Sequence, residues 1–247
     1  MSEPAAILGR LRSALGLATA GLLIGALCHP TLASLLAAAI GETPRRALSL
    51  PHLRALALNH LALAASGLAL TAALGVGLGI LATREAAASL RGAVDTLAAA
   101  AQAVPPVVVV ALALPVLGFG GPPTLLALVF YGVMPVLRGT TSSIEAVSPE
   151  TREAAQAIGL TRAQILTRVE IPLAAPGIIE ALRTALVLAV ATVAVGALAG
   201  APTLGTPVVA GLQNQNMVPM LQGTAATAAL AFLCDALMLA LAALVRR

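Results

Sequence analysis

Long, nearly uninterrupted apolar stretches dominate the chain, and short polar segments separate them. A helix needs about 20 mainly apolar residues to cross the roughly 30 Å hydrocarbon core of a bilayer. Six stretches predict membrane-spanning helices: Ala14–Ile40, Leu61–Thr83, Ala93–Leu117, Pro123–Leu137, Gly177–Ala199 and Thr224–Val245. The pattern therefore predicts an all-α fold, a polytopic transmembrane helix bundle of about six spans.

The segments between the spans are marked by proline and glycine. Residues 41–60 predict an external loop, either with a short interfacial helix at Leu53–Leu58 or as a plain connector. The loop 200–223 predicts a short re-entrant or surface helix at Pro207–Leu212. The polar run Gln213–Asn216 follows, and it indicates either a solvated loop or a docking surface for an external partner.

Charge then orients the bundle. The chain is 59% hydrophobic and 10% charged, and all 14 of its basic residues are arginines. Six spans would place eleven arginines on one side and only Arg45, Arg46 and Arg54 on the other. Because cytoplasmic loops retain arginine, both termini are predicted to be cytoplasmic. The net charge of +4 is then a topology signal, and nothing indicates nucleic-acid binding.

The first apolar stretch is too long for the core of a cleaved signal peptide, which favours a retained span. No His, Cys, Asp or Glu spacing predicts a metal site or cofactor, and no nucleophile and base share a usable spacing. The chain also lacks the GxxxxGK[ST] phosphate loop, so we expect neither catalysis nor ATP binding by this chain itself.

Three positions within the spans are candidates for a translocation path. Asp235 is the clearly deep charge, and it either lines a polar pathway or holds neighbouring helices together by hydrogen bonds. Gln102 and Pro105 indicate a broken or kinked helix beside such a path. Glu180 and Arg183, three residues apart, are expected to pair or to extend toward the interface.

One predicted cytoplasmic segment contains residues that typically begin and end helices. It includes the stretch EAAQAIGLTRAQILTRVEIP from Glu153 onward. Ser148 predicts an N-cap, and Gly159 predicts the left-handed residue that ends a first helix. Thr161 and Gln164 predict a capping box for a second helix, which should stop before Pro172. The segment therefore predicts two short helices joined at a glycine.

The spacing of the apolar positions predicts which face of each of these two helices is apolar. Ala154, Ala155 and Ile158 form one apolar face, and Ile165 and Val169 form a stripe on the second helix. Such an elbow would place one face under the bundle and offer the other to a cytoplasmic protein.

The segment resembles the EAA signature of permease subunits from bacterial ATP-binding-cassette (ABC) importers. The signature consists of Glu-Ala-Ala at 153–155, three residues, Gly159, nine residues, and Val169 to Pro172. Val169 and Ile171 stand where the family usually has Ile and Leu. In this family the two helices couple an ATPase to the spanning helices. The resemblance implies coupling positions at Arg152, Glu153, Ala154, Ala155, Gly159, Thr161 and Arg162.

The resemblance extends from about Asn59 to the C-terminus and is strongest to permeases for osmoprotectants. It is carried by His60-Leu61, Asp95 to Leu97, Gln102 to Pro105, Leu117 to Gly120, and Pro135 to Thr140. It implies two regions. Residues 1–58 form an N-terminal span and external connector, and residues 59–247 form a type I importer permease core with the EAA loop at about 148–172.

The family implies several partners: cytoplasmic ATPase subunits, a second identical or related permease subunit, an extracytoplasmic substrate-binding protein and the lipid of the bacterial inner membrane. The expected function is passage of glycine betaine, choline or carnitine. The chain has one Tyr, three Phe and no Trp, so it cannot readily build an aromatic cage for a quaternary ammonium group. Selective recognition would then belong to the binding protein. Alternatives are a permease for an amino acid or sulfonate, and an ion-coupled secondary transporter that uses Asp235.

Overall fold

The computed structural model describes residues 3–42, 46–84 and 91–245. Across these ranges the chain forms helices with short connections and no strand, which confirms the predicted all-α fold. In chain order the elements are α1 (Glu3–Ala26), α2 (Pro30–Ala39), α3 (Leu50–Ala82), α4 (Arg91–Ala103), α5 (Pro106–Leu117), α6 (Gly121–Glu145), α7 (Pro149–Ala157), α8 (Arg162–Ile165), the π-helical turn η2 (Leu166–Glu170), α9 (Ile171–Val193), the 3-10 turn η3 (Ala194–Ala199), α10 (Gly205–Gln213) and α11 (Met217–Val245).

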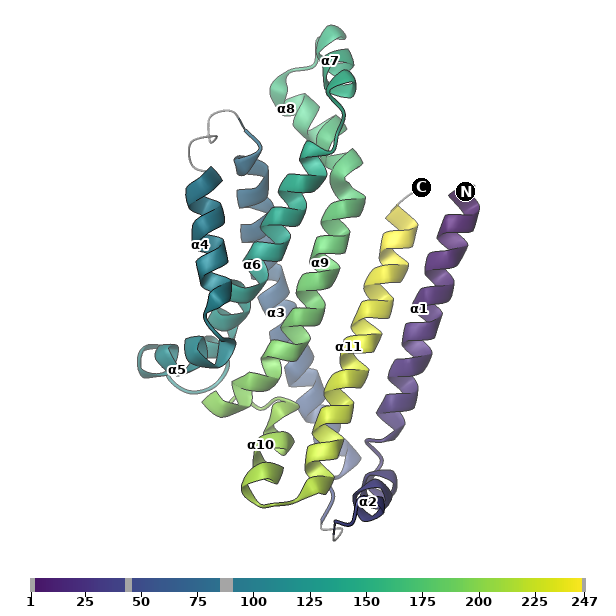
Figure 1. The fold of residues 1–247 in the computed structure, drawn as a ribbon, viewed down its shortest axis with the longest axis vertical. Coiled ribbons are helices and arrows are strands. Elements are labelled where there is room, and N and C mark those ends of the chain that lie inside the picture. Colours follow the sequence, from purple (N-terminus) through teal and green to yellow (C-terminus); the bar gives the residue numbers. More distant parts are fainter. Residues whose placement is uncertain (1–2, 43–45, 85–90, 246–247) are drawn as a thin grey trace.

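The long helices lie side by side in one bundle (Figure 1). Helix α6 packs between α3 and α9, α11 packs on α9, and α1 covers the outer side of α11. Helices α7 and α8 project at one end of the bundle, which we call the α7–α8 end, and both chain termini point toward it. Helices α2 and α10 lie at the opposite end, the α2–α10 end.

Five of the described helical segments are long and apolar enough to cross a membrane. They are Ile7–Ala26, Leu50–Ala82, Gly121–Glu145, Arg162–Ala199 and Met217–Ala243. The predicted third span is instead divided into α4 and α5 at Pro105 and Pro106. Pro105 has an extended backbone with ψ 141°, and neither proline has an amide hydrogen to continue the helical ladder. The predicted break near Pro105 is confirmed, and a continuous third span is wrong.

The predicted first span, Ala14–Ile40, is also wrong as a single helix. Helix α1 ends at Ala26, and His29 then takes an extended conformation and caps α2, with Pro30 at the first helical position. Because a residue before proline avoids the helical region, the chain breaks at this point. The spanning part is therefore α1, and α2 is a separate ten-residue helix at the α2–α10 end.

Two other helices run further than predicted. The short helix expected at Leu53–Leu58 is the first part of α3, because Pro51 lies in the first turn, where no amide hydrogen bond is lost. Helix α6 continues past Leu137 to Glu145 with Pro135 inside it. A proline within a helix leaves the carbonyl four residues earlier without its amide partner.

The second helix of the elbow does not stop before Pro172. Helices α8, η2 and α9 form one helical run from Arg162, and Ile171 N–H donates to the Leu166 carbonyl five residues earlier. The π turn loosens the ladder immediately before the proline, and Pro172 then occupies the first turn of α9. The elbow is therefore continuous with a membrane-spanning helix.

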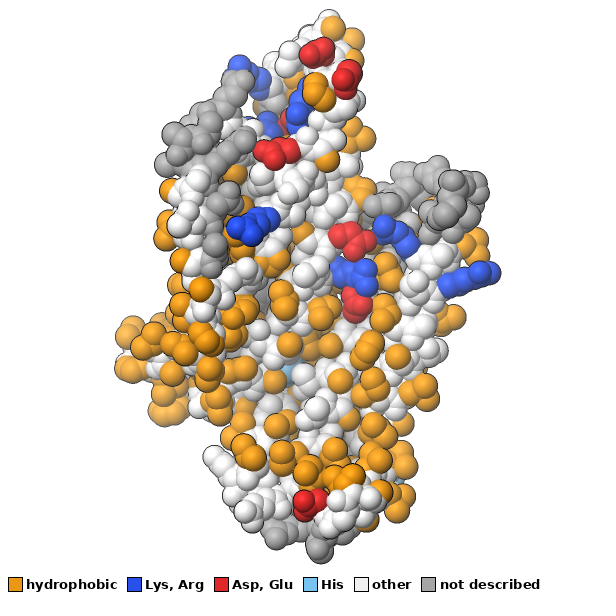
Figure 2. All heavy atoms as spheres, viewed as in Figure 1, with side chains coloured by type: hydrophobic (Ala, Val, Ile, Leu, Met, Phe, Trp, Pro, Cys, Tyr) orange, Lys and Arg blue, Asp and Glu red, His pale blue; other side chains and the backbone are white. Residues whose placement is uncertain are grey.

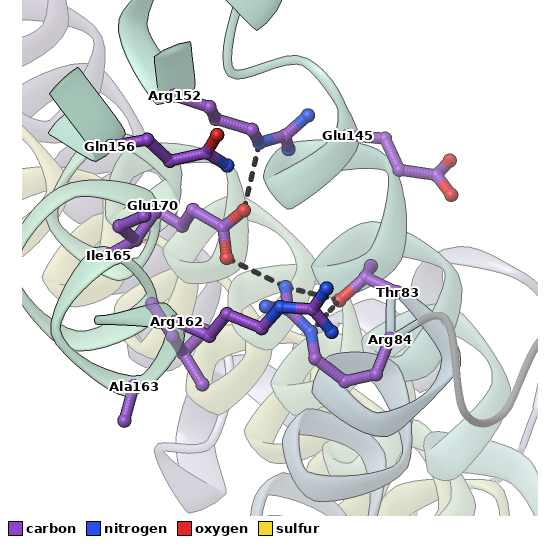
Figure 3. A pocket seen from close by; sticks show the side chains of 10 residues that line it. Thr83, Arg84, Glu145, Arg152, Gln156, Arg162, Ala163, Ile165 and Glu170 are labelled. Atoms are coloured by element: carbon purple, nitrogen blue, oxygen red, sulfur yellow. Dashed lines mark hydrogen bonds and ion pairs between the residues drawn. The ribbon is translucent and has the colours of Figure 1, made fainter. Parts of the chain in front are cut away.

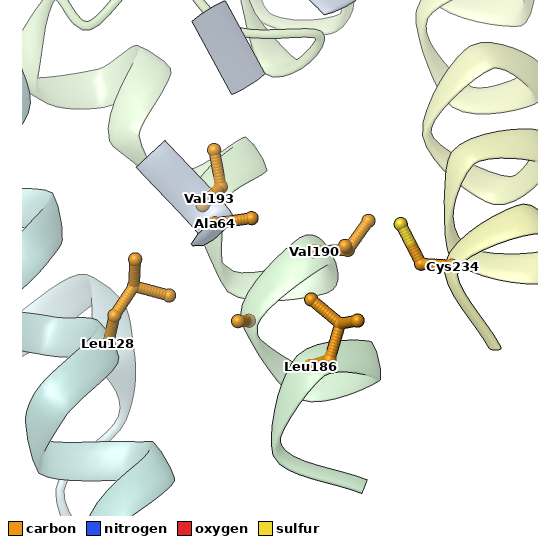
Figure 4. Close-up of a cluster of buried hydrophobic side chains, with 7 residues drawn as sticks. Ala64, Leu128, Leu186, Val190, Val193 and Cys234 are labelled. Carbon is orange, nitrogen blue, oxygen red and sulfur yellow. The ribbon is translucent and has the colours of Figure 1, made fainter. Parts of the chain in front are cut away.

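The small residues Gly75 and Gly79 allow α3 and α6 to pack closely. A Cβ atom at Gly79 would lie 2.7 Å from the Thr140 Cβ and 2.9 Å from the Leu137 carbonyl oxygen. Gly77, two residues away on the same helix, has open space at the corresponding position. Further along the same two helices, a buried apolar cluster joins α3, α6, α9 and α11 (Figure 4); its members are Ala64, Leu128, Leu186, Ala189, Val190, Val193 and Cys234.

Buried polar side chains fix the α2–α10 end. Gln222 of α11 is fully buried, and its Nε2 donates to the Cys28 carbonyl at 2.9 Å while its Oε1 accepts from Leu48 N–H at 2.8 Å. His60 of α3 is fully buried as well; its Nδ1 accepts from Leu204 N–H, so its Nε2 donates to the Val190 carbonyl at 2.8 Å. These two residues hold loop backbone where water is excluded.

We predict that Gly79→Ala destabilises the bundle while Gly77→Ala does not. The added methyl group at position 79 meets a backbone carbonyl that cannot rotate away, and overpacking of this kind costs about 1–3 kcal/mol. At position 77 the methyl group enters open space, and alanine favours the helix by about 1 kcal/mol. Thermal unfolding of the purified protein in detergent measures both changes; equal midpoints for the two variants would contradict the packing argument.

Candidate functional site

The elbow at the α7–α8 end begins with a fully capped helix. The Ser148 hydroxyl accepts a hydrogen bond from Thr151 N–H, and Pro149 occupies the first helical position. Glu150 follows in the first turn, where its own backbone N–H and the Ser148 hydroxyl hold the pKa of this carboxyl below its ordinary value. Nine residues alone make a marginal helix, so these caps define α7.

Gly159 ends α7 with a left-handed backbone. Its φ is +86°, Leu160 N–H donates to the Ala155 carbonyl at 3.1 Å, and Gly159 N–H donates to the Gln156 carbonyl at 2.9 Å. This pair of bonds is the Schellman arrangement. The predicted capping box follows directly, because Thr161 Oγ1 accepts from Gln164 N–H while Gln164 Oε1 accepts from Thr161 N–H at 2.8 Å. The predicted left-handed glycine and the predicted capping box are both confirmed.

The predicted apolar face of α7 lies partly on the outer surface of the elbow. Ala155 is buried, whereas Ala154 is exposed and Ile158 is 78% exposed. The left-handed turn that starts at Gly159 ends α7 at Ile158 and leaves its side chain in solvent. Glu153 and Gly159 are exposed on the same projecting unit. On the second helix the predicted stripe holds, with Ile165 buried and Val169 half-buried.

A buried carboxylate lies beneath this surface (Figure 3). Glu170 is 4% exposed, and each of its oxygens accepts from a different arginine: Oε1 from Arg152 Nε at 2.8 Å and Oε2 from Arg84 Nη2 at 2.7 Å. Arg152 also donates from Nη2 to the Ile144 carbonyl at 2.6 Å. Charge-assisted bonds of this length are among the strongest in proteins.

These side chains line a cleft of about 540 Å³ between the elbow and the end of α3. The lining residues are Thr83, Arg84, Glu145, Arg152, Gln156, Arg162, Ala163, Ile165, Leu166 and Glu170. Arg152 and Arg162 are among the positions predicted from the sequence, whereas Glu170 and Arg84 are not. The sequence feature that could have pointed to Glu170 is its position as a lone carboxylate directly before Ile171 and Pro172, which end the motif.

The three candidates for a translocation path lie apart from the elbow. Gln102 Nε2 donates to the Tyr131 carbonyl at 3.1 Å, and Tyr131 lies four residues before Pro135. Gln102 therefore supplies the hydrogen bond that Pro135 cannot make. Pro105 is exposed at the break between α4 and α5. Assignment of these residues and Asp235 to a path stays a prediction.

Asp235 belongs to a charged network among three helices. Arg183 of α9 donates to both carboxylate oxygens of Asp235 on α11. Arg183 also approaches Glu180 at 3.3 Å, which confirms their predicted pairing, and Glu180 accepts from Arg10 of α1 at 2.9 Å. Two positive and two negative groups thus join α1, α9 and α11. Charged side chains lie on this face above a broad band of hydrophobic surface (Figure 2).

Comparison with known proteins extends these observations. Residues 75–247 match the family described as binding-protein-dependent transport system inner membrane components. The chain is 33% identical over 181 residues to the glycine betaine/carnitine/choline transport system permease protein OpuCD of Bacillus subtilis, covering 73% of this chain and 78% of the relative. It is 31% identical over 180 residues to the osmoprotectant import permease protein OsmY of Salmonella typhimurium, covering 73% and 76% of the two chains.

A solved structure shares the fold. The methionine ABC transporter MetNI in an inward-facing conformation aligns with a TM-score of 0.73 and 21% identity, covering 81% of this chain and 100% of the other. The elbow with the EAA spacing, the apolar bundle and the match over residues 75–247 agree with one another. The chain belongs to the family of binding-protein-dependent transport system inner membrane components, the permease subunits of ABC importers.

Proposed function

We propose that this chain forms part of an importer that carries a small trimethylammonium osmoprotectant, such as glycine betaine, choline or carnitine, into a bacterial cell. The assignment as an importer subunit is supported above all by the projecting elbow, where Glu153, Ala154 and Gly159 of the EAA spacing are exposed beyond the apolar bundle. A permease needs this surface because it hydrolyses no ATP and must receive mechanical work from another protein.

The work would come from a cytoplasmic ATPase subunit that receives α7 and α8 in a surface groove. The two helices present a small-residue surface at Ala154 together with an acidic group at Glu153 and a large apolar group at Ile158. An apolar side chain that is 78% exposed on an otherwise polar tip suits a pocket on a partner. Thr161 and Arg162 would support this contact from the side of the elbow, while Arg152 and the buried Ala155 would hold α7 in place from beneath.

The ATPase contact also orients the chain. We place the α7–α8 end, and with it both termini, in the cytoplasm of a cell bounded by an inner membrane, and the α2–α10 end outside. Arg46 and Arg54 then remain outside, as the arginine distribution predicts. Residues 1–58 would be an N-terminal addition to a permease core at 59–247. A second permease subunit and an extracytoplasmic binding protein would complete the assembly.

The substrate class rests on the relatives. The matched permeases from Bacillus subtilis and Salmonella typhimurium are named for glycine betaine, carnitine, choline and osmoprotectant import. Few aromatic side chains are available in this chain, which favours recognition of the cation by the binding protein. An amino acid or a sulfonate is the alternative substrate. The family assignment favours either of these over an ion-coupled transporter that uses Asp235.

Uptake measurements test the substrate class. We expect vesicles that contain the permease, its ATPase and its binding protein to accumulate labelled glycine betaine, choline or carnitine in an ATP-dependent manner. Methionine and taurine should not compete at tenfold excess. Accumulation of methionine or taurine without uptake of any trimethylammonium compound would shift the assignment to the alternative substrates.

The ATPase contact is tested by Glu153→Arg. Reversal of the charge places a guanidinium against the basic group expected on the ATPase, and loss of a charge-assisted bond costs about 1.5–3 kcal/mol. We therefore expect at least tenfold less ATPase to co-purify with the variant in detergent. Glu42→Arg, which makes the same charge change at the α2–α10 end, is the control and should bind as wild type does. Undiminished binding by Glu153→Arg would remove Glu153 from the contact.

The glycine turn between α7 and α8 is tested by Gly159→Val. The space around Gly159 is open, so the penalty comes only from the left-handed backbone and amounts to about 1–2 kcal/mol. We expect Gly159→Val to misplace α7 relative to α8 and to lower uptake severalfold. Gly159→Asn, which tolerates this backbone better, should retain most of the uptake. Equal uptake by both variants and the wild type would contradict a requirement for the left-handed turn at residue 159.

A further inference from the structure

Arg152 supplies side-chain hydrogen bonds that connect helix α7 with the bundle. The direct contacts of α7 with other described helices are few, and the principal ones are with α8. Arg152 reaches from α7 to Glu170 Oε1 and to the Ile144 carbonyl near the end of α6. A displacement of α7 would therefore reach the bundle through the covalent chain and through the bonds of Arg152.

Glu170 lies at the point where the elbow becomes a spanning helix. It is the last residue of the π turn η2, and α9 begins at the next residue. π turns depart from the regular ladder and occur frequently at functional sites. Here the turn places a carboxylate, 4% exposed, between α7 and α3. A movement that shifts Glu170 also shifts the start of α9.

Arg84 continues the connection into α3. Its Nη2 donates to Glu170 Oε2, and both Nη2 and Nε donate to Thr83 Oγ1 at 2.8 and 3.1 Å. The Thr83 hydroxyl in turn donates to the Ile80 carbonyl at 2.7 Å. The guanidinium is thereby fixed against the last turn of α3, so its position follows that helix.

We propose that Glu170, with Arg84 and Arg152, is the joint that transmits displacement of α7 to α3 and α9. This inference rests on the proposed function, because the displacement comes from the ATPase. The three are positioning residues: none is on the exposed surface offered to the ATPase, and none is required to touch the transported solute. Loss of the joint separates ATP hydrolysis from transport while the ATPase stays bound.

The shape of the site suits this role. The two carboxylate oxygens have different arginine partners, one on α7 and one directly after α3, so neither arginine can move without stretching a bond to the same group. The adjoining cleft of about 540 Å³ gives the elbow room to move toward or away from α3. A joint needs a strong connection beside free volume, and both occur at Glu170.

The experiment measures solute taken up per ATP hydrolysed in vesicles that contain the complete importer. We expect Glu170→Gln to co-purify with the ATPase as wild type does and to lower this ratio at least tenfold. Glu150→Gln, the same change at an exposed carboxylate of α7 outside the joint, should keep the wild-type ratio. The double variant Arg84→Gln/Glu170→Gln should resemble Glu170→Gln alone, because both changes break the same connection.

Each outcome has a separate meaning. A wild-type ratio in Glu170→Gln overturns the joint and leaves the proposed function intact. Failure of the wild-type chain to bind any candidate ATPase overturns the proposed function instead. Should Glu170→Gln not assemble, Arg84→Gln decides, because it leaves the bond between Arg152 and Glu170 in place; a wild-type ratio in that variant overturns the joint, and a tenfold loss with intact ATPase binding supports it.

Discussion

The structure depends on one constraint: inside a bilayer, every backbone N–H and C=O must find a partner within the protein. The constraint is clearest at prolines, because each proline lacks the backbone N–H that would donate a hydrogen bond. Pro135 lies within α6, and the Gln102 side chain bonds the carbonyl of Tyr131 in its place. Pro105 lies where the helix stops altogether. Before Pro172 the ladder loosens into a π turn. The backbone thus accommodates these three prolines in three different ways: a side-chain hydrogen bond, a helix break and a π turn.

The same requirement explains the rare polar side chains in the apolar bundle. Gln222 and His60 are both fully buried, and each bonds backbone from a segment distant in sequence. The charged groups of Arg183 and Asp235 neutralise one another between α9 and α11. Because these residues serve particular backbone atoms or particular opposite charges, they fix which helices are neighbours in a bundle whose apolar contacts are individually unselective.

Much of this architecture could be predicted from the sequence, and the errors have physical causes. Local signals worked: Ser148, Gly159 and the Thr161 capping box define the elbow as expected, since a cap depends only on neighbouring residues. The hydropathy pattern predicted the apolar stretches correctly but not where the helices within them begin and end. Hydropathy depends only on side-chain polarity, so it does not indicate the break before Pro30 or the helical run through Pro172. The partners of Glu170 could not be predicted, because Arg84 lies 86 residues away in sequence and only the folded bundle brings them together.

Helix α1 packs on α11, the first helix of this chain against the last. Synthesis proceeds at about 5–20 residues per second, so on the order of 10 s separates the emergence of α1 from that of its partner. During that interval α1 is in the membrane without the surface it finally covers, and Arg10 has no Glu180 until α9 has been made. The contact between α1 and α11 therefore forms only after most of the chain has been synthesised, so α1 must remain in the membrane without it until then.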